Sequence, residues 1–382
     1  MIAPEVANTA ASGIRAVANA AWARPDANHL EFGEPDFDTP AHIVEAADRA
    51  ARDGHTRYGP SVGLPALRDA VTVKLARDNA LNSGQVVVTA GGVGALFATY
   101  RTLLSPGDEI LVPDPGWPNF GTIATLLGAV PRGYRLVEKD NHTPDYDHLA
   151  TLTSPRTKAI VTNSPSNPVG YQWTAAQMAE IGEWAARHNL VVISDECYDQ
   201  LWLDKPAPSF AAAAPGVPSV TVFSLSKSYA MTGWRVGYAV TTPELAAGLA
   251  RVQEVTASCV NTIAQHAAVA ALTGDQHCVA VMRTAYRERR DVALAAAQRL
   301  GLPATRPAGA FYLWLTVPGA QDDGFARRLL DETGTAAAPG TAFGPAGAGH
   351  LRLSLAAATD NVVRGLTDVR SLLAEHHPHP EK

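Results

Sequence analysis

Residues 158–195 read KAIVTNSPSNPVGYQWTAAQMAEIGEWAARHNLVVISD and decide the fold. The runs Lys158–Asn163 and Leu190–Asp195 are short, apolar and β-branched, which is typical of strands buried on both faces. A helical pattern lies between them, and Thr174 and Gln177 at its start have the spacing of a capping box. A strand, a helix and a second strand in this order predict a right-handed crossover and two parallel strands.

The same alternation continues on both sides of this unit. Further strands and helices are expected at Gln85–Ala90, Glu109–Pro113, Ser219–Leu225, Gly92–Leu104 and Trp117–Gly128. After Thr242 the pattern changes to long helices. A smaller unit follows, with strands near 310–317 and 350–355 and a final helix over about 360–375.

We therefore expect an α/β fold with two domains. The large domain, residues 45–285, has a mostly parallel sheet flanked by helices, and the smaller α+β domain spans 286–382. An N-terminal segment, residues 1–44, is expected to contribute to the small domain. Because this segment contains Gly33, Pro35 and Pro40, we expect its first forty residues to be irregular rather than helical.

Composition excludes several classes of protein. The 382 residues carry 31 basic and 37 acidic side chains, a net charge of −6, and no basic stripe, so no nucleic-acid partner is expected. The same absence of a basic extension disfavours a DNA-binding regulator. No apolar run approaches the roughly 18 residues of a membrane span, so no membrane partner is expected. Three cysteines and no secretory signal predict a cytoplasmic protein without a disulfide framework.

In a parallel sheet, ligands bind beyond the carboxyl ends of the strands. Lys227 follows an apolar strand, and a partly desolvated lysine is a nucleophile toward carbonyls, although a lysine in an exposed turn has the same local sequence. Asp195 also ends a strand, with Tyr198 three residues later. An acid there either caps a helix or pairs with a cation, such as the protonated ring nitrogen of pyridoxal phosphate.

Other residues that follow strands suit the rest of such a cofactor. Gly91, Gly92 and Val93 begin a helix and either form a tight turn or let backbone approach a phosphate, for which Arg235 offers a charge. Asn167 lies in a loop of turn-forming residues, and Trp117 is either a half-buried core aromatic or a platform for a ring.

Arg352 lies in the alternating run LRLSL, residues 351–355, which turns Arg352 and Ser354 to one face. That face is either exposed to water or holds a substrate carboxylate in the fork of the guanidinium. Alternation alone leaves both interpretations open.

Three segments together resemble the class I/II aminotransferases, which are fold type I enzymes dependent on pyridoxal phosphate. They are FGEPDF at 32–37, SLSKSYAMTGWRVG at 224–237 and LRLS at 351–354. The resemblance implies a ping-pong exchange of an amino group between an L-amino acid and a 2-oxo acid. It makes Lys227 the lysine that binds the cofactor as a Schiff base and then acts as a base, with Asp195 at the ring nitrogen.

The resemblance also implies the remaining roles. The cofactor would be held by Tyr198 and Asn167 at its phenolic oxygen, by Trp117 at its ring, and at its phosphate by Gly91, Gly92, Val93, Ser224, Ser226 and Arg235. The substrate carboxylate would bind to Arg352, Asn167 and Gly33. Tyr58 corresponds to a tyrosine that reaches the phosphate of the neighbouring subunit, which implies a homodimer with shared active sites. No metal is expected.

The chain departs from the family pattern at two positions. Val93 replaces a polar residue that faces the phosphate in many relatives, and Val169 replaces the threonine of the common Asn-Pro-Thr-Gly loop. Neither change removes a reacting group. Ile14, Arg15 and Phe32 are expected to build the wall opposite Arg352.

Other activities remain as alternatives. A β-lyase, decarboxylase or cyclase of the same fold would use the same residues, because the bond that breaks depends on the orientation of the substrate. A hydrolase would use the pattern GPSVG at 59–63, but the preceding residues are polar and form no buried strand. A dinucleotide enzyme would need a third glycine where Phe97 stands.

Overall fold

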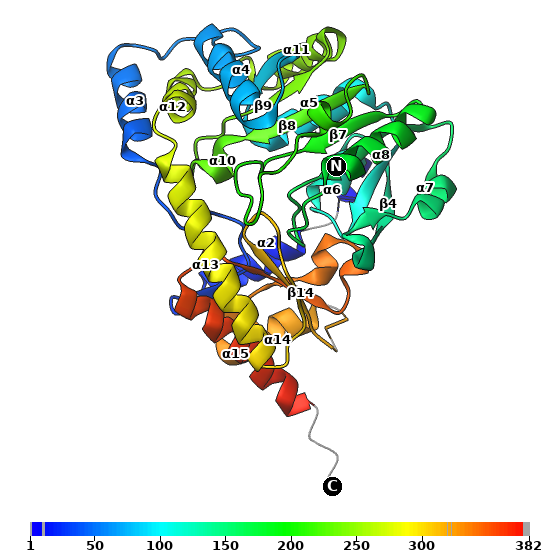
Figure 1. Cartoon of the computed structure of the whole chain (residues 1–382), viewed down its shortest axis with the longest axis vertical. Helices are drawn as coiled ribbons and strands as arrows, with labels where there is room; N and C mark the ends of the chain where they lie inside the picture. The colour runs from blue at the N-terminus through cyan, green and yellow to red at the C-terminus, as the bar shows by residue number, and fades with distance from the viewer. Residues whose placement is uncertain (1, 10–11, 319, 322, 377–382) are drawn as a thin grey trace.

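We describe a computed structural model of the chain, which covers residues 2–9, 12–318, 320–321 and 323–376 (Figure 1). Its largest element is an eight-stranded sheet in the order β2-β9-β8-β7-β6-β3-β4-β5. The strands are β2 Gln85–Thr89, β3 Glu109–Asp114, β4 Val130–Val137, β5 Thr143–Pro144, β6 Thr157–Asn163, β7 Val191–Asp195, β8 Ser219–Ser224 and β9 Gly237–Thr241.

The centre of this sheet is parallel, as the sequence predicts. Neighbouring strands from β8 through β7, β6 and β3 to β4 all pair in parallel. β9 is antiparallel to both of its neighbours, β2 and β8, and β5 is antiparallel to β4. The central strands therefore deliver their carboxyl ends to one edge, where the residues that follow them gather.

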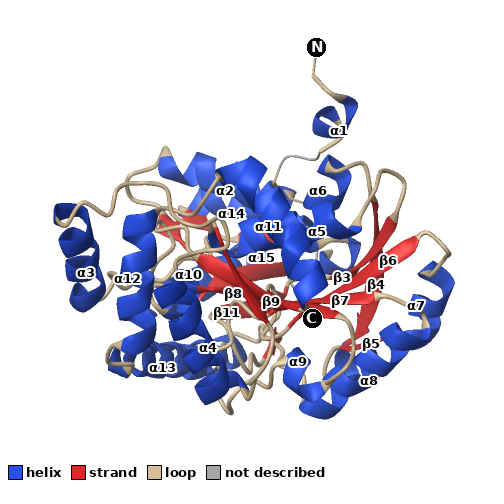
Figure 2. Ribbon diagram, turned by 90° about the horizontal axis from the view of Figure 1, so that it is seen from above, coloured by secondary structure: helices blue, strands red, loops and turns tan. Residues whose placement is uncertain are grey.

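Helices cover both faces of the sheet. Figure 2 shows α5, Gly91–Leu103, α6, Asn119–Leu126, and α11, Pro243–Ala257, on one face, with α8, Ala175–Arg187, and α9, Phe210–Ala213, on the other. The predicted capping box at the start of α8 is present. Further helices are α3 Ala41–Arg52, α4 Pro65–Asn79, α7 Tyr146–Leu152, α10 Leu225–Ser228 and α12 Thr262–Thr273.

A second, antiparallel sheet has the order β10-β11-β14-β13. Its strands are β10 Ala304–Thr305, β11 Tyr312–Thr316, β13 Ala338–Pro339 and β14 His350–Ser354. It packs with α13 His277–Arg299, α14 Gly324–Thr333 and α15 Thr359–His376. The long helix α13 runs from the region of α10 and α12 to this sheet (Figure 1). The predicted domain boundary at 285 falls inside α13 and stays a prediction.

Most of the N-terminal residues lie beside the second sheet, whereas α1, Pro4–Ala7, lies beside α6 (Figure 2). β1, Asn28–His29, pairs in parallel with β12, Thr335–Ala336. The remaining short helical elements are, elsewhere in the chain, the 3-10 turns Glu138–Asp140, Gly340–Phe343 and Pro345–Gly347. The expectation that the first forty residues lack helix is wrong for α2, Gly13–Trp22. Ser12 caps this helix, and its apolar side buries Val17, Ala18 and Ala21, whereas the glycine and prolines that suggested irregularity lie after it.

The described part of the chain contains no helix that combines the length and the apolar character needed to cross a bilayer.

Candidate active site

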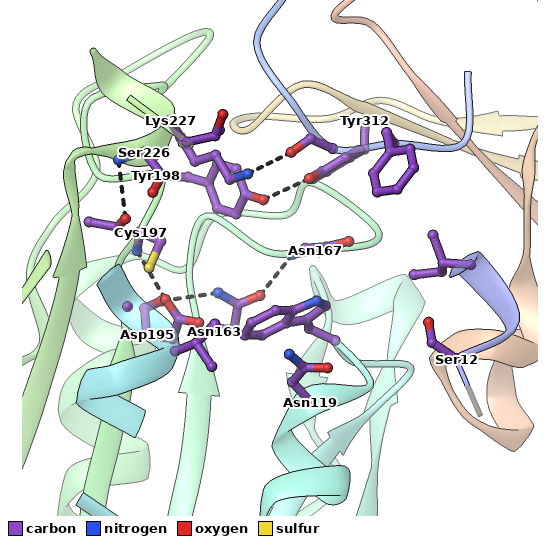
Figure 3. Close-up of a pocket in the computed structure, with 18 of the residues that line it drawn as sticks. Ser12, Asn119, Asn163, Asn167, Asp195, Cys197, Tyr198, Ser226, Lys227 and Tyr312 are labelled. Atoms are coloured by element: carbon purple, nitrogen blue, oxygen red, sulfur yellow. Dashed lines mark hydrogen bonds between the residues drawn. The ribbon is translucent and has the colours of Figure 1, made fainter. Parts of the chain in front are cut away.

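A cavity of about 320 Å³ lies at the carboxyl edge of the large sheet, between that sheet and the second one. Twelve of the residues to which the sequence assigned a catalytic, cofactor-binding or substrate-binding role line it. They are Gly33, Gly92, Val93, Trp117, Asn167, Asp195, Tyr198, Ser224, Ser226, Lys227, Arg235 and Arg352. Figure 3 shows Lys227, Cys197 and Asp195 on neighbouring elements around the same space.

Lys227 lies on α10, a single turn that begins directly after β8. Ser224 caps this turn by accepting a hydrogen bond from the Ser226 amide at 3.2 Å. The amine Nζ donates to the Gly33 carbonyl at 2.6 Å. Removal of the amine from water lowers the pKa of Lys227 to about 8. Near neutral pH a usable fraction of this amine is therefore uncharged and nucleophilic.

Asp195 ends β7 and is 4% exposed. Its carboxylate accepts a hydrogen bond from the Cys197 amide at 3.1 Å. Burial raises the pKa of Asp195, whereas the bonds from Cys197 and the charge of Lys227 act in the opposite direction. A buried acid with few partners suits a cationic ligand, because such a cation would stabilise its charged form.

Asn163 and Asn167 connect the neighbouring strand end to this acid. The side chain of Asn163, at the end of β6, donates to the Asp195 carbonyl at 3.0 Å and accepts from the Asn167 amide at 2.8 Å (Figure 3). These bonds fix the loop after β6, so that Asn167 faces the cavity. Asn163 was not predicted as a site residue, because an asparagine at a strand end is also common in turns.

Tyr198 and Tyr312 form a pair across the cavity. Their hydroxyl oxygens lie 2.7 Å apart, and their rings meet edge to face at 5.8 Å (Figure 3). Burial raises the pKa of both phenols, so both are protonated donors at neutral pH. Tyr312 was missed in the sequence, where an aromatic residue in an apolar strand looks like part of the core.

The start of α5 forms a cradle without side chains. Gly91 has a φ of 75°, and a Cβ there would lie 2.4 Å from Arg235 Nη2. A Cβ at Gly92 would lie 2.8 Å from the sulfur of Cys197. In the part of the chain that the structure describes, no side chain caps the start of α5. Its first amides and the Arg235 guanidinium therefore offer donors and positive charge to an anion.

Arg352 is 2% exposed, so the interpretation that it lies on a wet strand face is wrong. Its guanidinium donates to the Asn167 side chain at 2.9 Å and to the Glu31 carbonyl. Tyr312 lies beneath it, with the ring centroid 4.3 Å from Cζ. Among the described residues Nε has no hydrogen-bond partner, which leaves a buried donor for a ligand. A carboxylate oxygen is an acceptor of the kind that pairs with such a donor.

The cavity is also lined by Ile14, Arg15 and Phe32, which were expected to build the wall opposite Arg352. Their position opposite Arg352 stays a prediction. The guanidinium of Arg15 lies 5.1 Å from the centre of the Phe32 ring. Additional lining residues that the sequence did not single out are Ser12, Asn119, Asn163, Cys197, Thr232 and Tyr312.

Tyr58 is the predicted site residue that the structure leaves away from this cavity. It is 89% exposed and borders a separate hollow with Cys259, Val260 and Thr262. Gly91 does not line the cavity itself, but it adjoins Gly92 and contacts Arg235 as described above.

The cavity thus brings together the Lys227 amine, a buried acid, a helix start without side chains and a buried arginine. The model of the family "Aminotransferase class I and II" matches residues 26–369. The chain belongs to this family, and it is an aminotransferase, which moves an amino group between an amino acid and a 2-oxo acid.

Individual relatives agree along almost the whole chain. The aspartate/prephenate aminotransferase of Thermus thermophilus is 39% identical over 343 residues, which cover 88% of each protein. The aspartate aminotransferase of Geobacillus stearothermophilus is 35% identical and covers 94% of this chain and 95% of its own. The solved structure of an alanine aminotransferase from Pyrococcus furiosus superposes with a TM-score of 0.92 at 31% identity, covering 98% and 100% of the two chains.

Proposed function

We propose that this aminotransferase uses pyridoxal 5′-phosphate, bound in the cavity at the edge of the large sheet. The observation that carries this proposal is the convergence of Lys227, Asp195 and the glycine cradle on one space. The cofactor has an aldehyde, a basic ring nitrogen and a phosphate, and the three features match these three groups. When bound, pyridoxal phosphate supplies an electron-withdrawing ring that stabilises negative charge on the substrate α-carbon.

Each end of the cofactor has its own residues in this proposal. The start of α5 at Gly91–Val93, together with Ser224, Ser226 and Arg235, binds the phosphate. The absence of side chains at Gly91 and Gly92 supports this role, because a Cβ at either position would collide with Arg235 or Cys197. Tyr198 and Asn167 donate hydrogen bonds to the phenolic oxygen, and Trp117 covers one face of the ring.

Asp195 and Lys227 perform the proton chemistry. Asp195 holds a proton on the ring nitrogen, because a buried carboxylate favours a cation beside it. The Lys227 amine removes the α-proton of the amino acid in the first half-reaction. In the second half-reaction it delivers a proton to the corresponding carbon of the 2-oxo acid. Its pKa of about 8 suits this task, since an efficient base has a pKa near the working pH.

Arg352 binds and orients the substrate. Its guanidinium holds the α-carboxylate with the help of the Asn167 side chain and the Gly33 backbone, and its unpaired Nε is available for this contact. Fixing the carboxylate fixes the direction in which the α-proton points. The two half-reactions then follow one another on the same site, first with an amino acid and then with a 2-oxo acid.

We also propose a homodimer in which Tyr58 binds the phosphate of the partner subunit. The exposure of this large side chain and the hollow beside it support an interface there. The cytoplasmic location predicted from the sequence is in keeping with three free cysteines, Cys197, Cys259 and Cys278, and stays a prediction.

The test is a half-reaction without a second substrate. The protein is loaded with pyridoxal phosphate, single amino acids are added, and the absorption spectrum is followed. Conversion of the aldehyde form into the amine form, with release of one 2-oxo acid, supports the proposal. Release of ammonia or carbon dioxide instead would identify a lyase or a decarboxylase, and a protein that binds no cofactor would overturn the proposal.

A further inference from the structure

The loop that follows β1, residues 30–40, leads from the two-stranded sheet of β1 and β12 to the cavity without regular structure. Its Gly33 carbonyl accepts the hydrogen bond from Lys227. An acceptor at this distance stabilises the charged amine, so the placement of the loop influences the charge of Lys227. The contacts that hold the loop are therefore relevant to the reaction.

On the side of the large sheet, two side chains of the loop, Thr39 and Glu34, form hydrogen bonds with residues that follow Lys227. Thr39 Oγ1 donates to the Ala230 carbonyl at 2.6 Å and accepts from Trp234 Nε1 at 3.0 Å. The hydroxyl of Thr232 donates to Glu34. These partners all belong to the segment that follows Lys227. One side of the loop is therefore attached to the segment that carries the lysine.

On the other side the loop is held by Arg289 of α13. Its Nη1 and Nη2 donate to the two carboxylate oxygens of Asp36, each at 2.8 Å. The side chains are 15% and 30% exposed, so the pair is better shielded than an ordinary surface pair. Within the described residues it is the one ion pair that residues 33–40 make. A two-pronged contact of this kind fixes orientation as well as distance.

Arg289 also contacts the strand that carries Arg352. Its Nη1 donates to the carbonyl of Leu355, one residue after β14 ends, at 3.1 Å. The same guanidinium lies 5.6 Å from the centre of the Phe37 ring. Arg289 thus joins Asp36 of the loop to the end of β14. The start of the loop has its own contacts with this strand, because the Ser354 amide donates to the Leu30 carbonyl at 2.7 Å and Arg352 donates to the Glu31 carbonyl.

A row of aromatic rings runs from the loop to the cavity. Phe37 meets Tyr286 of α13 edge to face at 5.8 Å, Tyr286 lies 5.1 Å from Phe311, and Phe311 lies 4.9 Å from Tyr312. Rings in such contact leave little freedom for a lateral shift. Through this row, a displacement of Phe37 outside the cavity would displace Tyr312, which lines the cavity.

We propose that Arg289 is a positioning residue of the aminotransferase. By binding the Asp36 carboxylate and the Leu355 carbonyl, it orients the Gly33 carbonyl toward Lys227 and fixes the position of Gly33 relative to Arg352. Arg289 itself does not line the cavity. The part of this inference that concerns substrate binding rests on the proposed function, and the part that concerns the lysine does not.

The first experiment measures the lysine in the protein without cofactor. Acetylation of Lys227 by acetic anhydride is followed against pH by peptide mass spectrometry, which reports the midpoint of its deprotonation. In Arg289→Ala we expect the loop to stay attached at Thr39 and to cover the amine, but the Gly33 carbonyl should no longer be oriented toward Lys227. We expect the midpoint to fall by roughly half a unit to one unit from about 8, because the acceptor that favours the charged form is lost.

The other charged or titratable groups that act on this amine and lie outside the loop are Cys197, Asp195, Arg352 and Arg235, and they are unchanged in the variant. Glu34 lies in the loop and raises the pKa of the amine, so a displacement of its carboxylate would lower the midpoint in the same direction as loss of the carbonyl. An unchanged midpoint would overturn the proposal. A midpoint above the wild-type value would also overturn it, since that result means that the loop has lifted and exposed the amine.

Arg287→Ala is the matched control. Arg287 lies on the same helix, is also partly buried, and donates to the Leu203 carbonyl at 2.7 Å rather than to the loop. We expect its midpoint to equal that of the wild type. Arg289→Lys should recover part of the shift, because an ammonium keeps the charge but not the fork.

Asp36→Asn gives a second route to the same result and leaves α13 intact if Arg289→Ala does not fold. It should shift the midpoint in the same direction, and the double variant should shift it no further than Arg289→Ala, because both changes break one contact. Additive shifts would show that the two residues act separately and would contradict the proposal.

The second experiment uses the enzyme loaded with cofactor. In Arg289→Ala, Gly33 and Arg352 should no longer be held in a fixed position relative to each other. The KM for the amino acid should therefore rise on the order of tenfold, with a smaller change in kcat. A fall in kcat with KM unchanged would contradict this. A wild-type protein that transaminates no amino acid would refute the proposed function, while the acetylation midpoints would still decide the role of Arg289.

Discussion

The two halves of the cavity are built in different ways. The large-sheet half consists of Asp195, Lys227 and the cradle at Gly91 and Gly92, each of which lies at the carboxyl end of a strand of one sheet or shortly after it. The small-sheet half consists of Gly33, Tyr312 and Arg352, which come from opposite ends of the chain. The comparison teaches that strand ends place the reacting groups, whereas the packing of distant segments creates the binding site for the substrate. Changes in the first half should stop the chemistry, and changes in the second should weaken binding.

Replacement of Lys227 should have the largest effect. In Lys227→Ala no amine remains to move the α-proton, so the half-reaction should slow by about 10⁴ or more. Single-turnover absorption measurements with an amino acid test this. Lys158→Ala removes a lysine on the far part of β6 that is exposed to solvent, and should leave the rate unchanged. A Lys227→Ala protein with the wild-type rate would assign the base to another residue.

Replacement of Asp195 should come next in size. Asp195→Asn keeps the shape but loses the charge that holds a proton on the ring nitrogen, and we expect the half-reaction to slow by about a hundredfold to a thousandfold. Asp195→Glu should recover part of the rate. The same single-turnover assay measures both variants, and equal rates for Asp195→Asn and the wild type would remove this residue from the large-sheet half.

Arg352→Lys probes the small-sheet half. Loss of one partner from a buried charged contact costs about 2–5 kcal/mol, so kcat/KM should fall by about a hundredfold, mainly through KM. A lysine does not restore the contact, because its ammonium lacks the planar fork. Steady-state kinetics separate the two constants. If kcat fell alone, Arg352 would belong with the reacting groups and the distinction between the halves would fail.

Tyr312→Phe should have the smallest effect. It removes the hydrogen bond to Tyr198, and a single neutral hydrogen bond contributes about 0.5–1.5 kcal/mol, so we expect a loss in kcat/KM of about tenfold or less. Urea unfolding should show a decrease in stability of similar size. A larger loss than in Arg352→Lys would make Tyr312 a participant in the reaction.

The large-sheet half was largely predictable from sequence for a physical reason. A buried parallel strand is a short apolar run, and its end is marked by the first polar residue, so Asp195 and Lys227 stand out. The antiparallel strand β9, Gly237–Thr241, was not predicted, although it lies between β2 and β8. Its five residues begin two positions after Arg235, and this short run was not separated from the segment that contains Arg235.

The small-sheet half was less predictable. Alternation placed Arg352 on one face of a strand but did not show that Asn167 and Glu31, far away in the sequence, cover that face. Tyr312 was missed for the same reason, since it is recognisable as part of the site only after the second sheet has packed against the first. Helix α2 was missed because Gly33, Pro35 and Pro40, which lie after it, suggested that the whole N-terminal segment is irregular. Side-chain chemistry is local, whereas cover from solvent is a property of the whole fold.

The most direct measurement is to reduce the cofactor-loaded protein with borohydride, which fixes the cofactor to the amine that holds it, and to map the label by peptide mass spectrometry. The proposed site predicts one labelled residue, Lys227, and loss of label in Lys227→Ala. A label on Lys74 or another lysine, or a protein that takes up no label, would contradict the assignment of this cavity as the centre of the reaction.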